Sequence, residues 1–298
     1  MTPVRPELDQ AILASLDGLL GALDLTKTGD DRYRARPEPD RFLRVFGGTT
    51  VAQALLAAGG TVDGTPPHSL HAYFVQAGRS DEPLEIGIDH VRDGRTMSTR
   101  RATVEQGSRT LLVAMASFHD GPLEPEIADP PPSVPAPEAL PRLQDWLRDL
   151  PPELAAHGAS WVEHPPPLDL RIGEAPTFLG GPSSDASRSH WMRLPRDVGD
   201  DRLLHTVLLA YATDYLLLDM VFRSYPGGIR SRDFAAVSVD HAIWFHRPVR
   251  FDAWHLHTQR TLTLGGHRGL VHGAVHDADG HLVATVMQEV LLRPSVRG

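Results

Sequence analysis

Two stretches of the chain are apolar at nearly every position, and both are predicted to be buried helices. Residues His205 to Phe222 read HTVLLAYATDYLLLDMVF and contain neither proline nor glycine. Residues Gly47 to Gly59 form a second apolar segment with helical spacing. Because a helix that is apolar on every side must be covered on every side, we expect a curved sheet to wrap around each helix.

Long runs of alternating residues follow each predicted helix and are typical of antiparallel strands joined by tight turns. The two halves of the chain align without a gap when Gly94 is placed on Gly266, which also pairs Met115 with Met287. The pattern therefore predicts two copies of one unit, a helix followed by an antiparallel sheet, in the α+β class.

A proline-rich stretch separates the two copies. It covers residues 121–168, includes the run Asp129-Pro-Pro-Pro-Ser-Val-Pro-Ala-Pro, and has one short helical pattern over residues 143–150. Proline fixes the backbone and removes hydrogen-bond donors. We therefore predict a linker over residues 121–168, between an N-terminal module of residues 1–120 and a C-terminal module of residues 169–298.

The composition excludes several classes of protein. The formal net charge is -9 and basic runs are absent, which argues against nucleic acid or an anionic membrane surface as a partner. The lack of cysteine excludes disulfides, thiolate metal sites and a cysteine nucleophile. The first residues lack the features of a signal peptide, and no window approaches the roughly 20 apolar residues that cross a bilayer. We expect a cytoplasmic protein that does not enter membranes.

Asp214 is notable because it is a carboxylate on an apolar face of the predicted helix over residues 205–222. On a continuous helix its neighbours include Val207, Tyr211 and Leu218. An unpaired buried carboxylate costs several kcal/mol, so such a residue has either good hydrogen-bond partners or a chemical task. At this point a paired structural aspartate and a functional one are both open.

Two more polar side chains of the C-terminal copy are predicted to point inward. Ser238 lies at the head of a strand predicted over residues 237–246 and shares a face with Asp240. Gln288 lies on the last strand and shares its face with Val286 and Val290. Taken singly, such residues are usually structural. The first copy, however, has no acid in its helix and no glutamine opposite Gln288, which predicts one functional site per chain.

Several motifs occur in order between about residue 40 and the C-terminus. They are Phe46-Gly-Gly-Thr-Thr-Val-Ala-Gln-Ala-Leu, His68-Ser-Leu-His-Ala-Tyr-Phe, Arg92-Asp-Gly-Arg, Ala116-Ser-Phe, Tyr211-Ala-Thr-Asp, Asp240-His-Ala-Ile-Trp-Phe-His-Arg-Pro and Val286-Met-Gln-Glu. With these motifs the chain resembles the acyl-CoA thioesterase II family of double-hotdog hydrolases. The resemblance implies two fused hotdog modules, hydrolysis of fatty acyl-CoA to a free acid and CoA without cofactor or metal, and a homo-oligomer, either a dimer or a tetramer.

The resemblance also implies a catalytic trio, which falls on Asp214, Ser238 and Gln288. Ser238 stands where the family has threonine and keeps the hydroxyl, whereas Thr49 stands where the family usually has glutamine. Thioester hydrolysis needs an activated water and donors for the developing oxyanion. Asp214 is expected to act as general base or to orient the water, which Ser238 and Gln288 position. No Gly-x-Ser-x-Gly motif supports a serine nucleophile.

Gly47 and Gly48 are candidates for the oxyanion and substrate site, since N–H groups at a helix start face the positive end of its dipole. An ordinary helix start has the same appearance. Two other functions stay open: a hotdog enoyl-CoA hydratase that pairs Asp214 with His241 or His205, and an acyl-CoA binding protein without turnover. The three retained polar groups favour the hydrolase.

Other histidines and arginines are weaker candidates. The histidine pairs are His255/His257, His68/His71 and His241/His246. None has a nearby third ligand, so no metal site is predicted. The arginines that we consider for the phosphates of CoA are Arg92, Arg95, Arg100 and Arg101, which are otherwise a solvated strand face.

Overall fold

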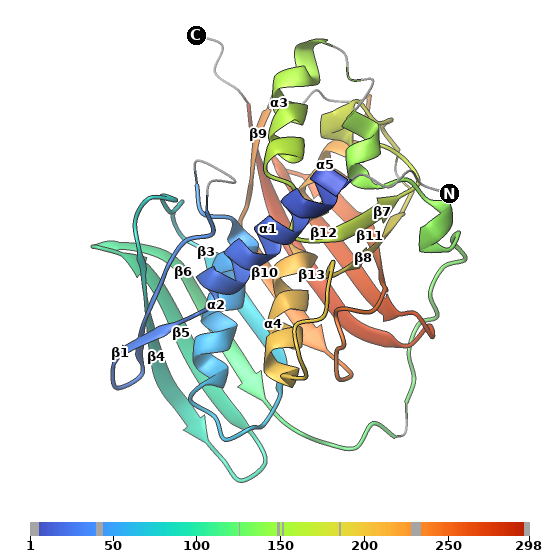
Figure 1. Cartoon of the computed structure of the whole chain (residues 1–298). Coiled ribbons are helices and arrows are strands. Elements are labelled where there is room, and N and C mark those ends of the chain that lie inside the picture. Colours follow the sequence, from blue (N-terminus) through green and yellow to red (C-terminus); the bar gives the residue numbers. More distant parts are fainter. Residues whose placement is uncertain are drawn as a thin grey trace.

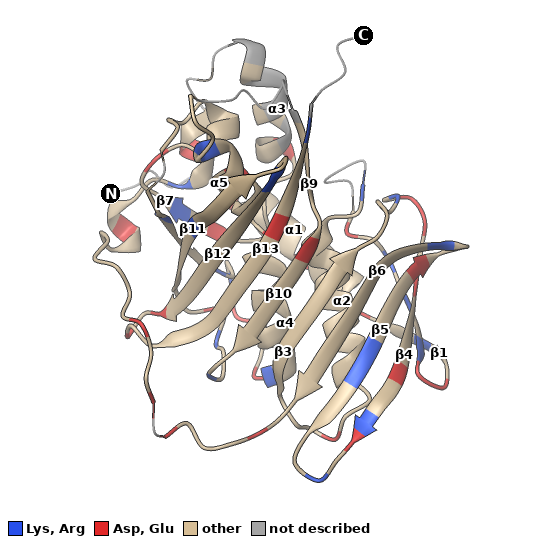
Figure 2. Cartoon of the chain, turned by 180° about the vertical axis from the view of Figure 1, so that it is seen from behind, with Lys and Arg blue, Asp and Glu red and all other residues tan. Residues whose placement is uncertain are grey.

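The chain is organised around one continuous antiparallel sheet. The computed structural model describes residues 6–39, 44–124, 126–147, 150, 152–184, 186–227 and 234–294. In this part of the chain, 13 strands form one sheet, with the order β1-β2-β4-β5-β6-β3-β10-β13-β12-β11-β8-β7 and with β9 paired to β13. Figure 2 shows the sheet from behind as a continuous curved surface.

The elements follow the predicted repeat. The first half contains α1 (Pro6–Ala22), β1 (Thr26–Gly29), β2 (Arg32–Ala35), α2 (Gly47–Gly59), β3 (Pro67–Phe74), β4 (Leu84–Asp93), β5 (Ser98–Gln106) and β6 (Arg109–Phe118). The second half contains β7 (Asp169–Ile172), the 3₁₀ turn η3 (Thr177–Leu179), β8 (Arg188–Arg193), α4 (Arg202–Thr213), α5 (Leu217–Arg223), β9 (Phe234–Ser238), β10 (Asp240–Phe245), β11 (His255–Gly265), β12 (Arg268–Asp277) and β13 (Leu282–Pro294).

The two modules join where β3 pairs antiparallel with β10, from Asp240 opposite Tyr73 to Trp244 opposite Ser69. The helices α2 and α4 pack against each other on the inner face of the sheet, and α1 crosses over them (Figure 1). This arrangement confirms the predicted α+β class and the double-hotdog fold.

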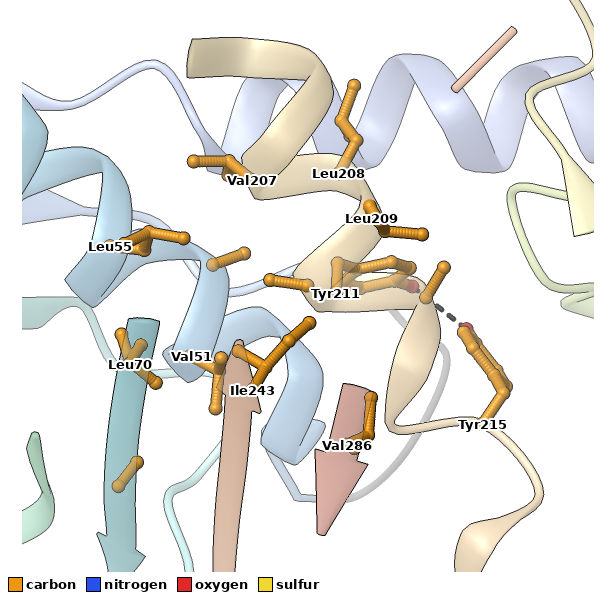
Figure 3. Close-up of a cluster of buried hydrophobic side chains, with 14 of the residues drawn as sticks. Val51, Leu55, Leu70, Val207, Leu208, Leu209, Tyr211, Tyr215, Ile243 and Val286 are labelled. Atoms are coloured by element: carbon orange, nitrogen blue, oxygen red, sulfur yellow. Dashed lines mark hydrogen bonds between the residues drawn. The ribbon is translucent and has the colours of Figure 1, made fainter. Parts of the chain in front are cut away.

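The core lies between the two central helices and the strands that join the modules. Figure 3 shows Val51 and Leu55 of α2 facing Val207 of α4, above Leu70 and Ile243. All five side chains are fully buried. Burial of each such side chain contributes about 1.5–3 kcal/mol, so this layer fixes the position of α2 against α4.

The segment between the modules contains more structure than the predicted linker. It includes the 3₁₀ helices η1 (Pro137–Ala139) and η2 (Leu143–Leu147) and the helix α3 (Pro152–Glu163). Leu143 is fully buried, and the Trp146 indole donates to the Ile172 carbonyl over 3.1 Å. The module boundaries at residues 120 and 168 stay a prediction.

The apolar segment over residues 205–222 is not one continuous helix, as the sequence predicted, but two. The helix α4 ends at Thr213, α5 begins at Leu217, and Leu216 between them has a φ of 66°. Side chains from the sheet hold this break: the Gln259 amide donates to the Tyr215 carbonyl over 2.8 Å, and Arg188 donates to the Leu216 carbonyl over 3.2 Å.

The sequence predicted that no stretch is long and apolar enough to cross a membrane, and this segment contradicts that prediction. Arg202–Arg223, with 22 residues, meets that test by length and composition alone. However, 89% of its most apolar window is buried inside the protein, as in the core helix of a globular fold.

The strand predicted over residues 237–246 is also interrupted, at Val239. Ser238 lies opposite Val290, whereas Ala242 lies opposite Met287. The chain therefore advances four residues along β9 and β10 where β13 advances three. The extra residue is a β-bulge, which reverses the alternation of side chains beyond it. Ser238 and the fully buried His241 therefore both point inward, and the predicted common face of Ser238 and Asp240 is wrong.

Candidate active site

Asp214 caps the C-terminal end of α4, where it meets the N-terminal end of α2. Only 8% of the residue is exposed. A Cβ atom on Gly47 would lie 2.8 Å from Asp214 Oδ2, and one on Gly48 would lie 2.6 Å from the Tyr211 carbonyl oxygen. The paired glycines therefore allow the start of α2 to approach the carboxylate, and larger residues would force the two helix ends apart.

The electrostatic environment of Asp214 contains opposing influences. Burial raises the pKa of Asp214 above its usual value, whereas the nearby His241 and hydrogen bonds from the Gly48 N–H and the Gln288 amide lower it. The C-terminal dipole of α4 disfavours a negative charge at this position, and the N-terminal dipole of α2 favours it. Burial is the largest of the effects on the pKa, so the carboxyl group takes up a proton more readily than an exposed aspartate.

Gln288 connects the other candidate residues. Its Nε2 donates to Ser238 Oγ over 2.8 Å, and its Oε1 lies 2.6 Å from His241 Nδ1. The structure therefore brings Asp214, Ser238 and Gln288 together at the end of α4. Gln288 is fully buried in β13, behind Ser238.

His241 is a member of this network that the sequence did not single out for hydrolysis. Because an amide oxygen only accepts hydrogen bonds, His241 Nδ1 must donate to Gln288. His241 Nε2 lies 3.2 Å from Thr213 Oγ1, which also bonds the Ala210 carbonyl over 2.9 Å. In a regular strand with Ser238 facing inward, His241 would face outward, and the bulge at Val239 reverses this. For catalysis, the sequence offered His241 only as a partner of Asp214 in a hydratase.

A cavity of about 880 Å³ opens beside Asp214 and Ser238. Its walls are mostly apolar and come from both modules, among them Phe46, Phe74 and Val237. Gly47 lines the cavity as well, whereas Gly48 does not. The carboxylate and the hydroxyl thus close one end of a space suited to an apolar ligand.

A second cavity, of about 680 Å³, lies at the opposite ends of α2 and α4. Here Gly59 faces Leu203, and a Cβ on Gly59 would lie 2.6 Å from Leu203 Cδ2. Leu203 and Gly59 meet where the first site has Asp214 and Gly47. The contrast accords with the predicted single functional site in each chain.

The histidines other than His241 are engaged elsewhere. His205 accepts from the Phe251 N–H through Nδ1, so its Nε2 donates to the Gly199 carbonyl. It therefore holds the start of α4, far along the helix from Asp214. The His257 and His190 rings lie with their centroids 5.1 Å apart and tilted by 57°, and neither belongs to a group with metal-binding geometry among the described residues. Among the described residues, such a group is formed by Asp277, Asp279 and His281 on a partly exposed turn.

The four arginines considered for the CoA phosphates do not line the cavity beside Asp214. Arg100 is buried and donates to Thr61 and Asp93, and Arg101 pairs with Asp89. Of the two alternatives, the solvated strand face fits the exposed Arg92, Arg95 and Arg101, whereas Arg100 is buried.

The fold and the site together define a double-hotdog protein in which a buried carboxylate closes one cavity between the modules. The family model described as the acyl-CoA thioesterase C-terminal domain matches residues 128–292, and the model of the N-terminal domain matches residues 37–119. The chain belongs to the acyl-CoA thioesterase II family, which confirms the resemblance seen in the sequence.

Individual relatives agree with this assignment. The chain is 32% identical to the acyl-coenzyme A thioesterase 8 of Mus musculus, with 91% of this chain and 87% of that protein covered. It is 31% identical to the acyl-CoA thioesterase 2 of Haemophilus influenzae, with 93% and 98% covered. Among solved structures, the tesB protein of Mycobacterium avium subsp. paratuberculosis superposes with a TM-score of 0.77 at 30% identity, with 94% of this chain and 100% of that chain covered.

Proposed function

We propose that the chain hydrolyses fatty acyl-CoA to a free fatty acid and CoA, with a water molecule activated by Asp214, Ser238 and Gln288. The family supports the reaction class. The observation that carries the assignment of residues is the Gln288 amide, which donates to Ser238 Oγ at the end of the cavity that Asp214 also lines.

The roles of the three residues follow from their hydrogen bonds. Because Gln288 Oε1 accepts from His241, its amide nitrogen must face Ser238 and Asp214. Ser238 Oγ already accepts from this nitrogen, which leaves its proton available for a water molecule or for Asp214. Gln288 and Ser238 thus position the water, and Asp214 accepts its proton.

In the proposed reaction, Asp214 takes one proton from the water molecule while the water oxygen attacks the thioester carbonyl carbon. The carbon–sulfur bond then breaks, and the proton passes from Asp214 to the departing CoA thiolate. A carboxylate whose pKa is raised by burial is a better base for this step than an exposed one. The Gly47 N–H, at the start of α2 and on the cavity wall, is the donor for the oxyanion.

The test is release of free thiol from a panel of acyl-CoA esters. We expect turnover by the wild type and a loss of at least about 100-fold in Asp214→Asn, since the amide cannot take the proton. Asp240→Asn is the matched control, because Asp240 bonds the Glu289 N–H in the sheet and does not line the cavity. Full activity of Asp214→Asn would show that the base lies elsewhere, and saturable binding without thiol release would identify a binding protein.

We also propose that the chain forms a homo-oligomer in the cytoplasm. Large apolar side chains are exposed on the outer face of the central strands, with Tyr73 63% and Met115 40% exposed. The strand β3 contains no Lys, Arg, Asp or Glu, and β6 contains one such residue, Arg109, at its first position. Light scattering after gel filtration tests the assembly: a monomer in the wild type, or no change on Tyr73→Asp, contradicts association through this face. Cell fractionation tests the location.

A further inference from the structure

Two arginines stand at the open end of the cavity whose closed end holds Asp214. Arg44 and Arg293 line this cavity, and both are exposed, whereas Asp214 is buried. Apart from Asp214, they are the charged residues among the described residues that line it. The cavity therefore leads from a buried carboxylate, along apolar walls, to an exposed pair of positive charges.

Hydrogen bonds of the backbone fix both arginines in place, one from each module. Arg44 forms a bridge with Arg79, and the next residue, Val45, donates its N–H to the Gly78 carbonyl over 3.1 Å. Arg293 lies within β13, opposite Ala235 of β9. The backbone is thus ordered on both sides of the opening, and only the long side chains are free to adjust.

Neither guanidinium has an acidic partner among the described residues, although most exposed arginines nearby do. Arg79, which forms an isolated bridge with Arg44, pairs with Asp81 and Glu82. Arg268, which lies opposite Leu291 at the same end of β13 as Arg293, pairs with Glu289. The two cavity arginines therefore retain their full hydrogen-bonding capacity for an anionic ligand.

We propose that Arg44 and Arg293 bind the phosphate groups of CoA. This rests on the proposed site, because it places the thioester at Asp214 and the pantetheine arm along the apolar walls. The chain carries a formal net charge of -9, so it repels a polyphosphate unless positive charge is concentrated at the opening. Guanidinium groups suit this task because they bind phosphate oxygens in a bidentate manner.

The decisive comparison uses one acyl group on two carriers, CoA and pantetheine, which lacks the phosphates. For Arg44→Gln and Arg293→Gln we expect the KM for the acyl-CoA ester to rise about tenfold each, with kcat nearly unchanged, as for a lost charge-assisted hydrogen bond. Hydrolysis of the acyl-pantetheine ester should not change. The double variant should use both esters with similar kcat/KM.

Arg95→Gln is the matched control, because Arg95 is also an exposed arginine of the N-terminal module but does not line the cavity. An equal loss of activity on both esters in the cavity variants would mean that the arginines act through the fold and would overturn the proposal. An equal rise in KM in Arg95→Gln would reduce the effect to overall charge and would overturn it too. Failure of the proposed catalytic role of Asp214 is a separate outcome, because Asp214→Asn would then remain active on both esters.

Discussion

The orientation of a single amide decides how the proposed site works. Gln288 can place either its oxygen or its nitrogen toward Ser238, and only the nitrogen donates to both Ser238 and Asp214. Gln288 Oε1 lies 2.6 Å from His241 Nδ1 and both residues are fully buried, so a donating Nδ1 holds the amide in this orientation. His241 is therefore a positioning residue, one step removed from the water.

Replacement of His241 tests this role. In His241→Leu, the Gln288 oxygen loses its donor, which costs about 1–3 kcal/mol of stability and frees the amide to turn. We expect kcat to fall about 10- to 100-fold with little change in KM. His241→Asn offers an amide N–H near the former Nδ1 position and should restore part of kcat. Steady-state kinetics on folded protein decide the matter, and equal kcat values in the two variants would contradict the role.

The contact between Gly47 and Asp214 gives a second test at this scale. A Cβ atom on Gly47 would lie 2.8 Å from Asp214 Oδ2 and 3.0 Å from Phe74 Cζ. Gly47→Ala should therefore displace the carboxylate and lower kcat/KM about 10- to 100-fold, while the helix itself gains from alanine. Gly21→Ala is the control, because a Cβ on that helical glycine has no heavy atom within 4 Å. A normal kcat/KM in Gly47→Ala would show that an added Cβ does not displace the Asp214 carboxylate.

At the scale of elements, two irregularities place the candidate residues. The break between α4 and α5 ends the helix at Asp214, and the bulge at Val239 turns both Ser238 and His241 inward. In each case side chains or strands from elsewhere in the chain stabilise the irregular backbone. Regular elements alone do not bring these groups together.

This division explains how much the sequence predicts. The apolar helices, the repeat and the inward Gln288 follow from local periodicity, and the proposed trio is what the family resemblance implies. The break at Leu216 depends on Gln259 and Arg188, which are distant in sequence on β11 and β8. The bulge depends on the register between β9, β10 and β13. A periodic pattern along one segment contains no information about either irregularity, so it does not place His241 beside Gln288.

The support of the helix break is testable through Gln259. The side chain is fully buried, and its amide donates to the Tyr215 carbonyl, next to Asp214. Gln259→Leu should lower the free energy of unfolding by about 1–3 kcal/mol and also reduce kcat, because the end of α4 loosens. Gln53→Leu is the control, since this buried amide holds the Ala22 and Arg36 carbonyls near α1. Urea unfolding should show a similar loss of stability in the two variants. Thiol release should show a loss of kcat in Gln259→Leu alone.

At the scale of the whole molecule, the candidate site belongs to neither module alone. Asp214, Ser238 and Gln288 come from the second module, whereas Gly47 and Phe74 come from the first. The continuous pairing of β3 with β10 and the packing of α2 on α4 hold these parts in register. Any condition that weakens the sheet or its core therefore weakens the site as well.

Acid is one such condition, because histidines are buried without charge inside the second module. Burial lowers the pKa of His190 to about 3, and it lowers the pKa of His257 beside it well below the usual value. Both His190 nitrogens lack a hydrogen-bond partner among the described residues. The unfolded chain binds a proton at each histidine near pH 6.5, whereas the folded chain does not.

The sign of the effect follows directly. Above about pH 6.5 these histidines are neutral in both states and do not change stability with pH. Below about pH 6.5 the unfolded state binds more protons than the folded state. The free energy of unfolding therefore decreases as the pH is lowered, by up to about 1.4 kcal/mol per pH unit for each histidine. For His190 this continues down to about pH 3, its folded pKa.

His190→Leu should therefore unfold less readily in acid than the wild type, with a shallower dependence on pH between 6.5 and 3. Leucine makes no hydrogen bonds, and His190 makes none in the described structure, so little is lost at neutral pH. Urea unfolding across this range measures the slope, with His281→Gln as the control because His281 is exposed. An unchanged slope in His190→Leu would mean that His190 is not buried in its neutral form.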